Sequence, residues 1–240
     1  MGTTANKLKI LAAIPAYNEE KFIYEVASET IKYVDEVVVI NDGSTDNTSD
    51  VAKKSGASLI NHHINKGKGM ALNTALSYAR RTGTDILVFL DGDGQHNPNE
   101  IPNLIMPVLN GHADMVIGSR FMKNNKIPKY RMLGQTVLNI ATNIGCGIKV
   151  SDSQSGFRAL SHKAINCLQF TEEGLAVESE MQFLAKRHML KVSEVPITTN
   201  YDNGLKRSPI VHGFGVLFRV TRLIPKYSWR LNAIKPGPIK

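Results

Sequence analysis

Short apolar runs alternate with longer stretches of helical spacing along the first half of the chain. The helical spacing predicts helices over residues 19–31, 47–54, 70–79 and 101–109. The apolar runs predict strands over residues 8–13, 37–40, 86–90 and 115–117. Continuous apolar strands that alternate with helices are typical of an α/β fold with a mostly parallel sheet, covered by helices on both faces.

The second half of the chain is less regular. Helices are predicted over residues 130–145 and 177–188, with a strand near 192–197. A further apolar stretch at 210–224 carries basic residues and is too short to span a bilayer. It can lie in a membrane interface or pack as an amphipathic helix on the core of its own domain, and the sequence leaves both open.

Polar clusters follow three of the predicted strands. PAYNEE occupies 15–20, NDGS occupies 41–44 and DGD occupies 91–93. Parallel sheets bind ligands at the carboxyl ends of their strands. We therefore expect the three clusters to form one site at one edge of the sheet.

Two carboxylates, Asp91 and Asp93, stand two residues apart in the last of these clusters, beside Gly92 and Gly94. The glycines permit a turn in which both carboxylates converge on one point. Because carboxylates so close repel each other, a hard divalent cation such as Mg²⁺ or Mn²⁺ suits them, and Gln95 adds a neutral oxygen. The alternative is a polar turn whose side chains cap the following helix.

A second candidate for ligand binding is NKGKGM at 65–70. Lysines and glycines just before a helix suit an anion, because backbone N–H groups and the helix dipole add to the lysine charge. A basic loop that merely begins a helix is the simpler interpretation.

Composition places the chain among folded globular proteins. Its 240 residues suit one domain, with 42% hydrophobic and 21% charged residues. The two cysteines, Cys146 and Cys167, lack metal-ligand spacing and predict free thiols in a reducing compartment. The first residues lack the apolar core of a signal peptide, so we expect a cytoplasmic protein.

The positive charge is concentrated at one end. Eight of the 29 basic residues and none of the 21 acidic residues follow Asp202, so the formal net charge of +8 belongs to the last 38 residues. A basic end favours anionic partners. A nucleic-acid-binding protein is one alternative, but the basic segment lacks interleaved aromatic residues and the rest of the chain is charge-balanced, so we expect no nucleic acid.

The motifs together resemble a known family. PAYNEE, INDGSTDNT, NKGKGMALNTAL, FLDGDGQHNP, GSR and DSQSGFRAL occur in the order found in family 2 glycosyltransferases of the GT-A fold. The resemblance covers about residues 8–200 and is greatest to dolichyl- and polyprenyl-phosphate glycosyltransferases such as dolichol-phosphate mannose synthases. It implies a GT-A domain over 1–208, with a nucleotide-sugar half at about 1–118, an acceptor half at about 119–208, and a basic tail at 209–240.

The resemblance also assigns residues to the donor. The family holds the nucleotide sugar with residues that match Pro15, Tyr17, Glu19, Asp42, Lys68 and Asp91. It binds the divalent cation with residues that match Asp91, Asp93 and Gln95. For Asp42 we predict a nucleotide contact, whereas for Glu20 and Asp46 we predict that the side chain caps a helix or turn.

On the acceptor side, the resemblance implies phosphate contacts from Arg120, Arg131, Arg158 and Lys206. Arg120 and Arg131 are also catalytic candidates, together with Asp152, which would act as a base or orient the acceptor and the arginines. Glu178 and Glu180 are rivals for the base, or complement a helix dipole. An ionised phosphate acceptor needs little help from a base.

The expected function is an inverting transfer of a sugar from GDP-mannose or a UDP-hexose to a dolichyl or polyprenyl phosphate. The basic tail would place the enzyme at the cytoplasmic face of a membrane, alone or with a membrane partner subunit. The alternative within the same fold is transfer to a hydroxyl of a glycan or small molecule, which would require a base.

Overall fold

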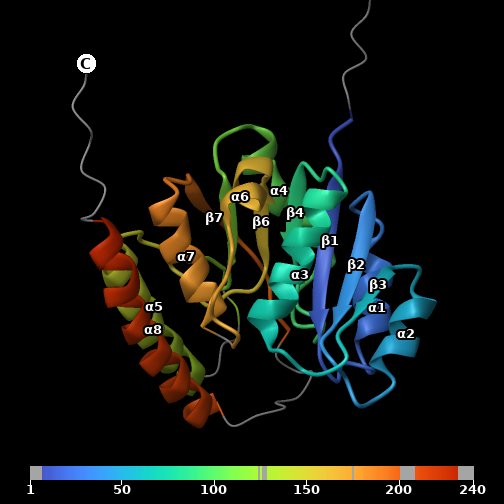
Figure 1. The fold of residues 1–240 in the computed structure, drawn as a ribbon, viewed down its shortest axis with the longest axis horizontal. Helices are drawn as coiled ribbons and strands as arrows, with labels where there is room; N and C mark the ends of the chain where they lie inside the picture. The colour runs from blue at the N-terminus through green and yellow to red at the C-terminus, as the bar shows by residue number, and fades with distance from the viewer. Residues whose placement is uncertain (1–6, 124, 126–128, 175, 201–208, 232–240) are drawn as a thin grey trace, which may run out of the picture.

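The structure is a computed structural model that describes residues 7–123, 125, 129–174, 176–200 and 209–231. These residues form one sheet with helices on both faces (Figure 1). The strands are β1 (Ile10–Ala16), β2 (Glu36–Asn41), β3 (Ser58–Asn61), β4 (Ile86–Phe89), β5 (Met115–Ser119), β6 (Arg158–Ser161) and β7 (Val192–Pro196). The α-helices are α1 (Ile23–Thr30), α2 (Thr48–Lys54), α3 (Lys68–Arg81), α4 (Ile101–Leu109), α5 (Lys129–Cys146), α6 (His162–Cys167), α7 (Val177–Arg187) and α8 (Pro209–Leu231).

The sheet contains seven strands within the described residues, in the order β3-β2-β1-β4-β6-β5-β7. All neighbouring strands are parallel except β6, which runs antiparallel between β4 and β5. The prediction of a mostly parallel, helix-covered sheet is confirmed. The strands β3 and β6 and the short helix α6 were not predicted.

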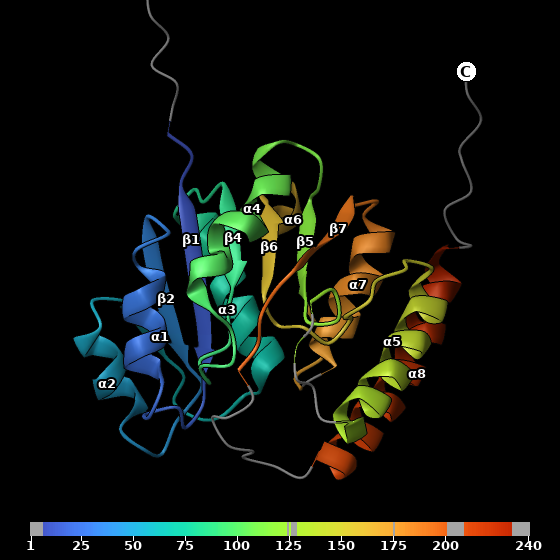
Figure 2. The same cartoon turned by 180° about the vertical axis from the view of Figure 1, so that it is seen from behind.

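Alternate residues of each strand point into two separate cores. On one face, Leu11 and Ala13 of β1 pack with α3, α6 and α7. On the other, Ala12 and Ile14 pack with α1, α2 and α4. Because both faces of the sheet are buried, the strands read as continuous apolar runs rather than alternating ones. Figure 2 shows the second layer, with α1, α2 and α4 in front of the sheet.

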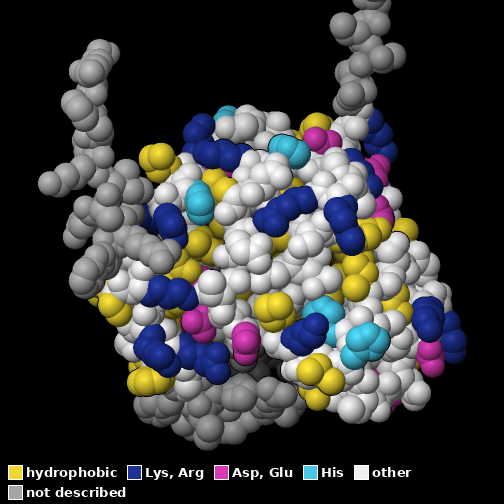
Figure 3. Space-filling model, in the orientation of Figure 1, with side chains coloured by type: hydrophobic (Ala, Val, Ile, Leu, Met, Phe, Trp, Pro, Cys, Tyr) yellow, Lys and Arg dark blue, Asp and Glu magenta, His cyan; other side chains and the backbone are white. Residues whose placement is uncertain are grey.

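The last helix, α8, packs beside α5 at one end of the molecule (Figures 1 and 2). Val220 and Leu223 of α8 are fully buried. Arg219 pairs with Glu172 at 3.6 Å, and Lys226 pairs with Glu180 at 3.7 Å. Figure 3 shows Lys and Arg side chains gathered over α8 with acidic side chains beside them.

The packing of α8 therefore corresponds to the second of the two expectations for the 210–224 stretch, an amphipathic helix on the core of its own domain. No helix among the described residues is long and apolar enough to cross a membrane. Lys206 lies outside the described residues.

Candidate active site

The three polar clusters lie together at the carboxyl ends of β2, β1 and β4, which are neighbours in the sheet. The backbone N–H of Asp42 donates to Ala16 O at 2.8 Å. The N–H of Asn18 donates to the Ser44 hydroxyl at 3.0 Å. The expected convergence of the clusters at one edge of the sheet is thus observed, and it follows from parallel strands ending at one edge.

Asp42 shapes the loop that precedes α3. Its carboxylate accepts from the backbone N–H groups of Lys66 at 2.9 Å and Gly67 at 2.8 Å. It also contacts Nδ1 of His62 at 2.7 Å. Asp42 is 4% exposed, so in this structure it acts as an organiser of the loop. The predicted nucleotide contact of Asp42 stays a prediction.

Two glycines allow the start of α3 to press against the chain near residue 172. A Cβ on Gly69 would stand 1.7 Å from the backbone oxygen of Glu172, and a Cβ on Gly67 would stand 2.2 Å from that of Glu173. The N–H of Gly69 donates to Glu173 O at 2.9 Å. Lys68, which lies between these glycines, is therefore fixed at its backbone.

The side chain of Lys68 bridges two carboxylates. Its Nζ atom lies 2.5 Å from Oδ1 of Asp91 and 2.7 Å from Oε1 of Glu178, at the start of α7. Burial opposes ionisation of Asp91, but the Lys68 ammonium outweighs it and holds the pKa of Asp91 below its usual range. Burial likewise opposes the charge on Lys68, and the two carboxylates overcome it, so the pKa of Lys68 is raised.

The acidic turn that contains Asp91 and Asp93 is held by hydrogen bonds within the turn itself. The carboxylate of Asp93 accepts from the backbone N–H of Gln95 at 3.0 Å and from its side-chain amide at 2.6 Å. Asp91, Asp93 and Gln95 thus stand on one turn, as the sequence indicates. Within the described residues, no three His, Cys, Asp or Glu side chains are grouped so that they could hold a metal ion by themselves.

The turn contacts the loop that leads into β6. A Cβ on Gly156 would stand 2.4 Å from Oδ2 of Asp91, so a larger residue there would displace the Asp91 carboxylate. The resemblance places donor residues at Asp91 and acceptor residues in the 152–158 loop. The structure brings these two segments into contact.

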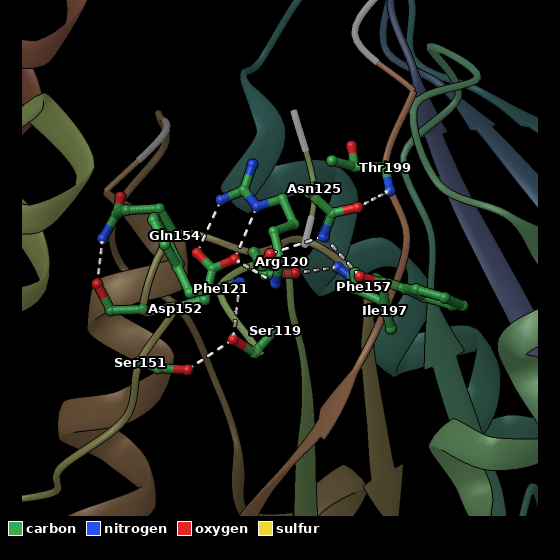
Figure 4. Close-up of polar contacts among 12 residues, drawn as sticks. Ser119, Arg120, Phe121, Asn125, Ser151, Asp152, Gln154, Phe157, Ile197 and Thr199 are labelled. Carbon is green, nitrogen blue, oxygen red and sulfur yellow. Dashed lines mark hydrogen bonds and ion pairs between the residues drawn. The ribbon is translucent and has the colours of Figure 1, made fainter. Parts of the chain in front are cut away.

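Arg120 and Asp152 form a buried, two-pronged ion pair (Figure 4). Nε of Arg120 donates to Asp152 at 2.7 Å, and Nη2 donates at 2.8 Å. The backbone N–H of Arg120 also donates to this carboxylate. Asp152 is fully buried. Of the two roles predicted for Asp152, this geometry favours the one that orients an arginine.

Arg158 makes structural contacts with backbone carbonyls. Its guanidinium is fully buried and donates to the backbone oxygens of Ser153 at 2.7 Å, Ser155 at 2.9 Å and Glu178 at 3.0 Å. Burial lowers the pKa of Arg158 to about 10, which still leaves it charged at neutral pH. Arg158 therefore holds the 153–155 loop against α7, and its predicted contact with the acceptor phosphate stays a prediction.

Several other predicted residues have structural contacts. Glu20 accepts from the backbone N–H of Asn47 at 3.0 Å, and Asp46 accepts from that of Thr48 at 2.9 Å, so both cap the start of α2 as predicted. Glu180 is fully buried and accepts from the backbone of Thr171 and from the Tyr227 hydroxyl. Glu180 thus anchors α8 rather than serving as a base.

The remaining donor-side residues lie where the sequence places them. Pro15 is the second-last residue of β1, and Tyr17 and Glu19 follow in the turn to α1, all partly buried. The backbone N–H of Glu19 donates to the Thr48 hydroxyl at 2.7 Å. Arg131 lies in the first turn of α5, and its side chain is outside what the structure describes.

Lys68–Glu178 is the pair that sequence reasoning missed. Glu178 was considered only as a base or as a complement to the helix dipole. The one available signal was the acidic first turn of the helix, with Glu178 and Glu180 two residues apart. That signal does not name a partner.

Comparison with known proteins agrees with the family resemblance of the sequence motifs. The family model described as Glycosyl transferase family 2 matches residues 12–169. A UDP-N-acetylglucosamine–dolichyl-phosphate N-acetylglucosaminyltransferase of Methanococcus voltae is 35% identical over an alignment 245 residues long, and the match covers 91% of this chain and 97% of that protein. An undecaprenyl-phosphate mannosyltransferase of Micrococcus luteus is 29% identical, covering 80% of this chain and 83% of the other.

Among solved structures, the glucosyl-3-phosphoglycerate synthase of Mycobacterium tuberculosis, in complex with Mn²⁺, uridine diphosphate and glucosyl-3-phosphoglycerate, superposes with a TM-score of 0.73. The two chains are 25% identical, and the match covers 92% of this chain and 80% of that one.

Proposed function

Because the chain belongs to glycosyl transferase family 2 and has the GT-A fold of that family, we propose that it transfers a sugar from a nucleotide-diphosphate sugar to a polyprenyl phosphate. The observation that carries the proposal is the contact between the acidic turn and the loop of Asp152, which joins a donor end to an acceptor end. Two relatives named for transfer to dolichyl or undecaprenyl phosphate support this acceptor class.

Asp91, Asp93 and Gln95 would hold a divalent cation, Mg²⁺ or Mn²⁺. They fit such an ion because they offer hard oxygen atoms on one turn, and because the Lys68 ammonium already stands on Asp91 as a cation. When bound, the cation offsets the negative charge that develops on the leaving nucleoside diphosphate. Lys68 adds a second positive charge at the same end of the donor.

The acceptor phosphate would be held by Arg120. The Asp152 carboxylate fixes the plane of that guanidinium, which suits the forked geometry of phosphate oxygens. A phosphate oxygen attacks the anomeric carbon as the bond to the nucleoside diphosphate breaks, with inversion. Because the phosphate is already ionised near neutral pH, no proton has to be removed. A reaction that needs no base agrees with the pairing of the Asp152 carboxylate with Arg120.

Calorimetry on GDP-mannose, UDP-glucose and UDP-N-acetylglucosamine, with and without Mn²⁺, tests the donor site. We expect Mn²⁺-dependent binding of one of them, and loss of that binding by at least about a hundredfold in Asp93→Asn, because one charged ligand of the cation is removed. The exposed Asp50→Asn variant is the control. Unchanged donor affinity in Asp93→Asn would contradict the site, and transfer to sugar hydroxyls instead of polyprenyl phosphate would contradict the acceptor.

Exposed apolar side chains on α5 and α8 support a membrane-surface location. Ile140 and Ile144 of α5 and Phe218 of α8 are exposed, and Arg222 stacks on Phe218. Basic residues beside exposed apolar ones favour an anionic bilayer surface, at about 1 kcal/mol for each charge. We expect the protein to float with vesicles containing anionic lipid and Phe218→Ser to float several-fold less. No flotation with the anionic vesicles would contradict this location, and equal flotation with purely zwitterionic vesicles would contradict the role of the basic residues.

A further inference from the structure

The Lys68 ammonium occupies one oxygen, Oδ1, of the Asp91 carboxylate, which is one of the proposed cation ligands. Its Nζ atom lies 2.5 Å from Asp91 and 2.7 Å from Glu178, and all three side chains are at least three-quarters buried. An ammonium and a divalent cation cannot both sit against the same carboxylate oxygen without strong repulsion. A cation that binds Oδ1 of Asp91 therefore displaces Lys68 from that oxygen.

Glu178 can accept the Lys68 ammonium when the divalent cation binds Asp91. Its Oε1 atom already contacts Lys68, and its Oε2 atom is buried without a hydrogen-bond partner among the described residues. A lysine ammonium has three N–H donors. An N–H that leaves Asp91 can therefore pass to a second carboxylate oxygen on Glu178, so the buried charge of Lys68 remains compensated.

We propose that Glu178 is a positioning residue that keeps the Lys68 ammonium in the site when Asp91 exchanges it for the divalent cation. Lys68 then faces the diphosphate of the donor rather than solvent. The inference rests on the proposed function, since it takes the cation and the diphosphate from it. The glycines around Lys68 fix its backbone, so the exchange involves only the side chain.

This role predicts an effect of removing Glu178 on diphosphate affinity that is opposite to the effect expected from charge repulsion alone. Glu178 is a buried negative charge beside an anion site, so its removal alone should tighten binding of a diphosphate. If Glu178 acts through Lys68, Glu178→Gln should instead weaken binding, because the ammonium loses its retaining partner. In a Lys68→Met background only the repulsion remains, so the same substitution should tighten binding.

The experiment is a double-mutant cycle on UDP and GDP affinity by calorimetry at saturating Mg²⁺. We expect Glu178→Gln to weaken binding of the diphosphate that the wild type binds by about tenfold, the effect of one charge-assisted hydrogen bond. Glu178→Gln added to Lys68→Met should tighten it. Mn²⁺ titration without nucleotide, followed by electron paramagnetic resonance, should show several-fold tighter binding in Lys68→Met, because the competing ammonium is gone.

Two exposed ion pairs provide matched controls. Lys163→Met and Glu29→Gln remove the same charges from surface pairs with Asp114 and Lys32, and should leave both affinities unchanged. Glu178→Asp keeps the charge but withdraws the carboxylate, so it should also weaken diphosphate binding. It also serves as the test if Glu178→Gln does not fold.

The outcomes separate the inference from the function it rests on. Tighter diphosphate binding in Glu178→Gln, or in Glu178→Asp should the first variant not fold, overturns the role of Glu178. Unchanged Mn²⁺ affinity in Lys68→Met overturns the exchange at Asp91. A wild-type protein that binds neither diphosphate with any divalent cation refutes the proposed function, and the inference with it.

Discussion

Asp152→Asn should lower transfer to polyprenyl phosphate by about a hundredfold and destabilise the fold by about 3–5 kcal/mol. The carboxylate is fully buried and accepts three N–H groups of Arg120, including its backbone N–H. An asparagine keeps the shape but leaves the guanidinium without a compensating charge. Steady-state kinetics with varied acceptor, together with urea denaturation, measure both effects.

The kinetic pattern distinguishes a positioning carboxylate from a base. If Asp152 orients Arg120, the loss should appear mainly in the KM for the acceptor, with donor affinity by calorimetry unchanged. Arg120→Ala should then cause a similar loss, and the double variant should lose little more than either single one, because the two residues act as a unit. A loss confined to kcat in Asp152→Asn, with additive effects in the double variant, would restore the base.

The edge at which the site forms could be predicted because it depends on local patterns. An apolar run followed by glycine and polar residues marks the end of a strand, and parallel strands end together. The clusters after β1, β2 and β4 therefore had to meet once those strands were parallel neighbours. The cap at Asp46 follows from equally local chemistry, because its partner Thr48 is two residues away, whereas Glu20 reaches Asn47 across 27 residues.

The acceptor side was harder to predict because its contacts join distant segments. β6 has the sequence RALS, so it lacks the continuous apolar run that marks β1, β2 and β4, and it runs antiparallel to β4. The pairing of Lys68 with Glu178 joins two helices, α3 and α7, that are far apart in the sequence. Nothing in a single sequence indicates which acidic residue meets which lysine over such a separation.

Arg158 shows that the residue type alone does not identify the partner of a side chain whose surroundings are unknown. An arginine in an acceptor-side motif suggests a phosphate ligand, because phosphate is the usual partner of a guanidinium at such sites. Backbone carbonyls satisfy it equally well, and three of them surround Arg158. Its burial could be known only after β6 was placed in the middle of the sheet.

Arg158→Met should destabilise the protein by about 4 kcal/mol or more. The substitution removes charged hydrogen bonds worth about 1.5–3 kcal/mol each and leaves buried carbonyls of Ser153, Ser155 and Glu178 without these donors. Urea denaturation of the variant and of the wild type gives the difference in the free energy of unfolding, provided that this free energy depends on urea concentration with the same slope in both proteins.

The exposed Arg187→Met, at the end of α7, is the control, and it should change the stability by no more than about 1 kcal/mol. Because the 153–155 loop follows Asp152, loosening it should also raise the KM for the acceptor in any folded fraction of Arg158→Met. A variant as stable as the wild type, with its defect confined to the acceptor KM, would return Arg158 to the role of a phosphate ligand. The three carbonyls would then have to find other donors, which a buried loop without the guanidinium does not supply.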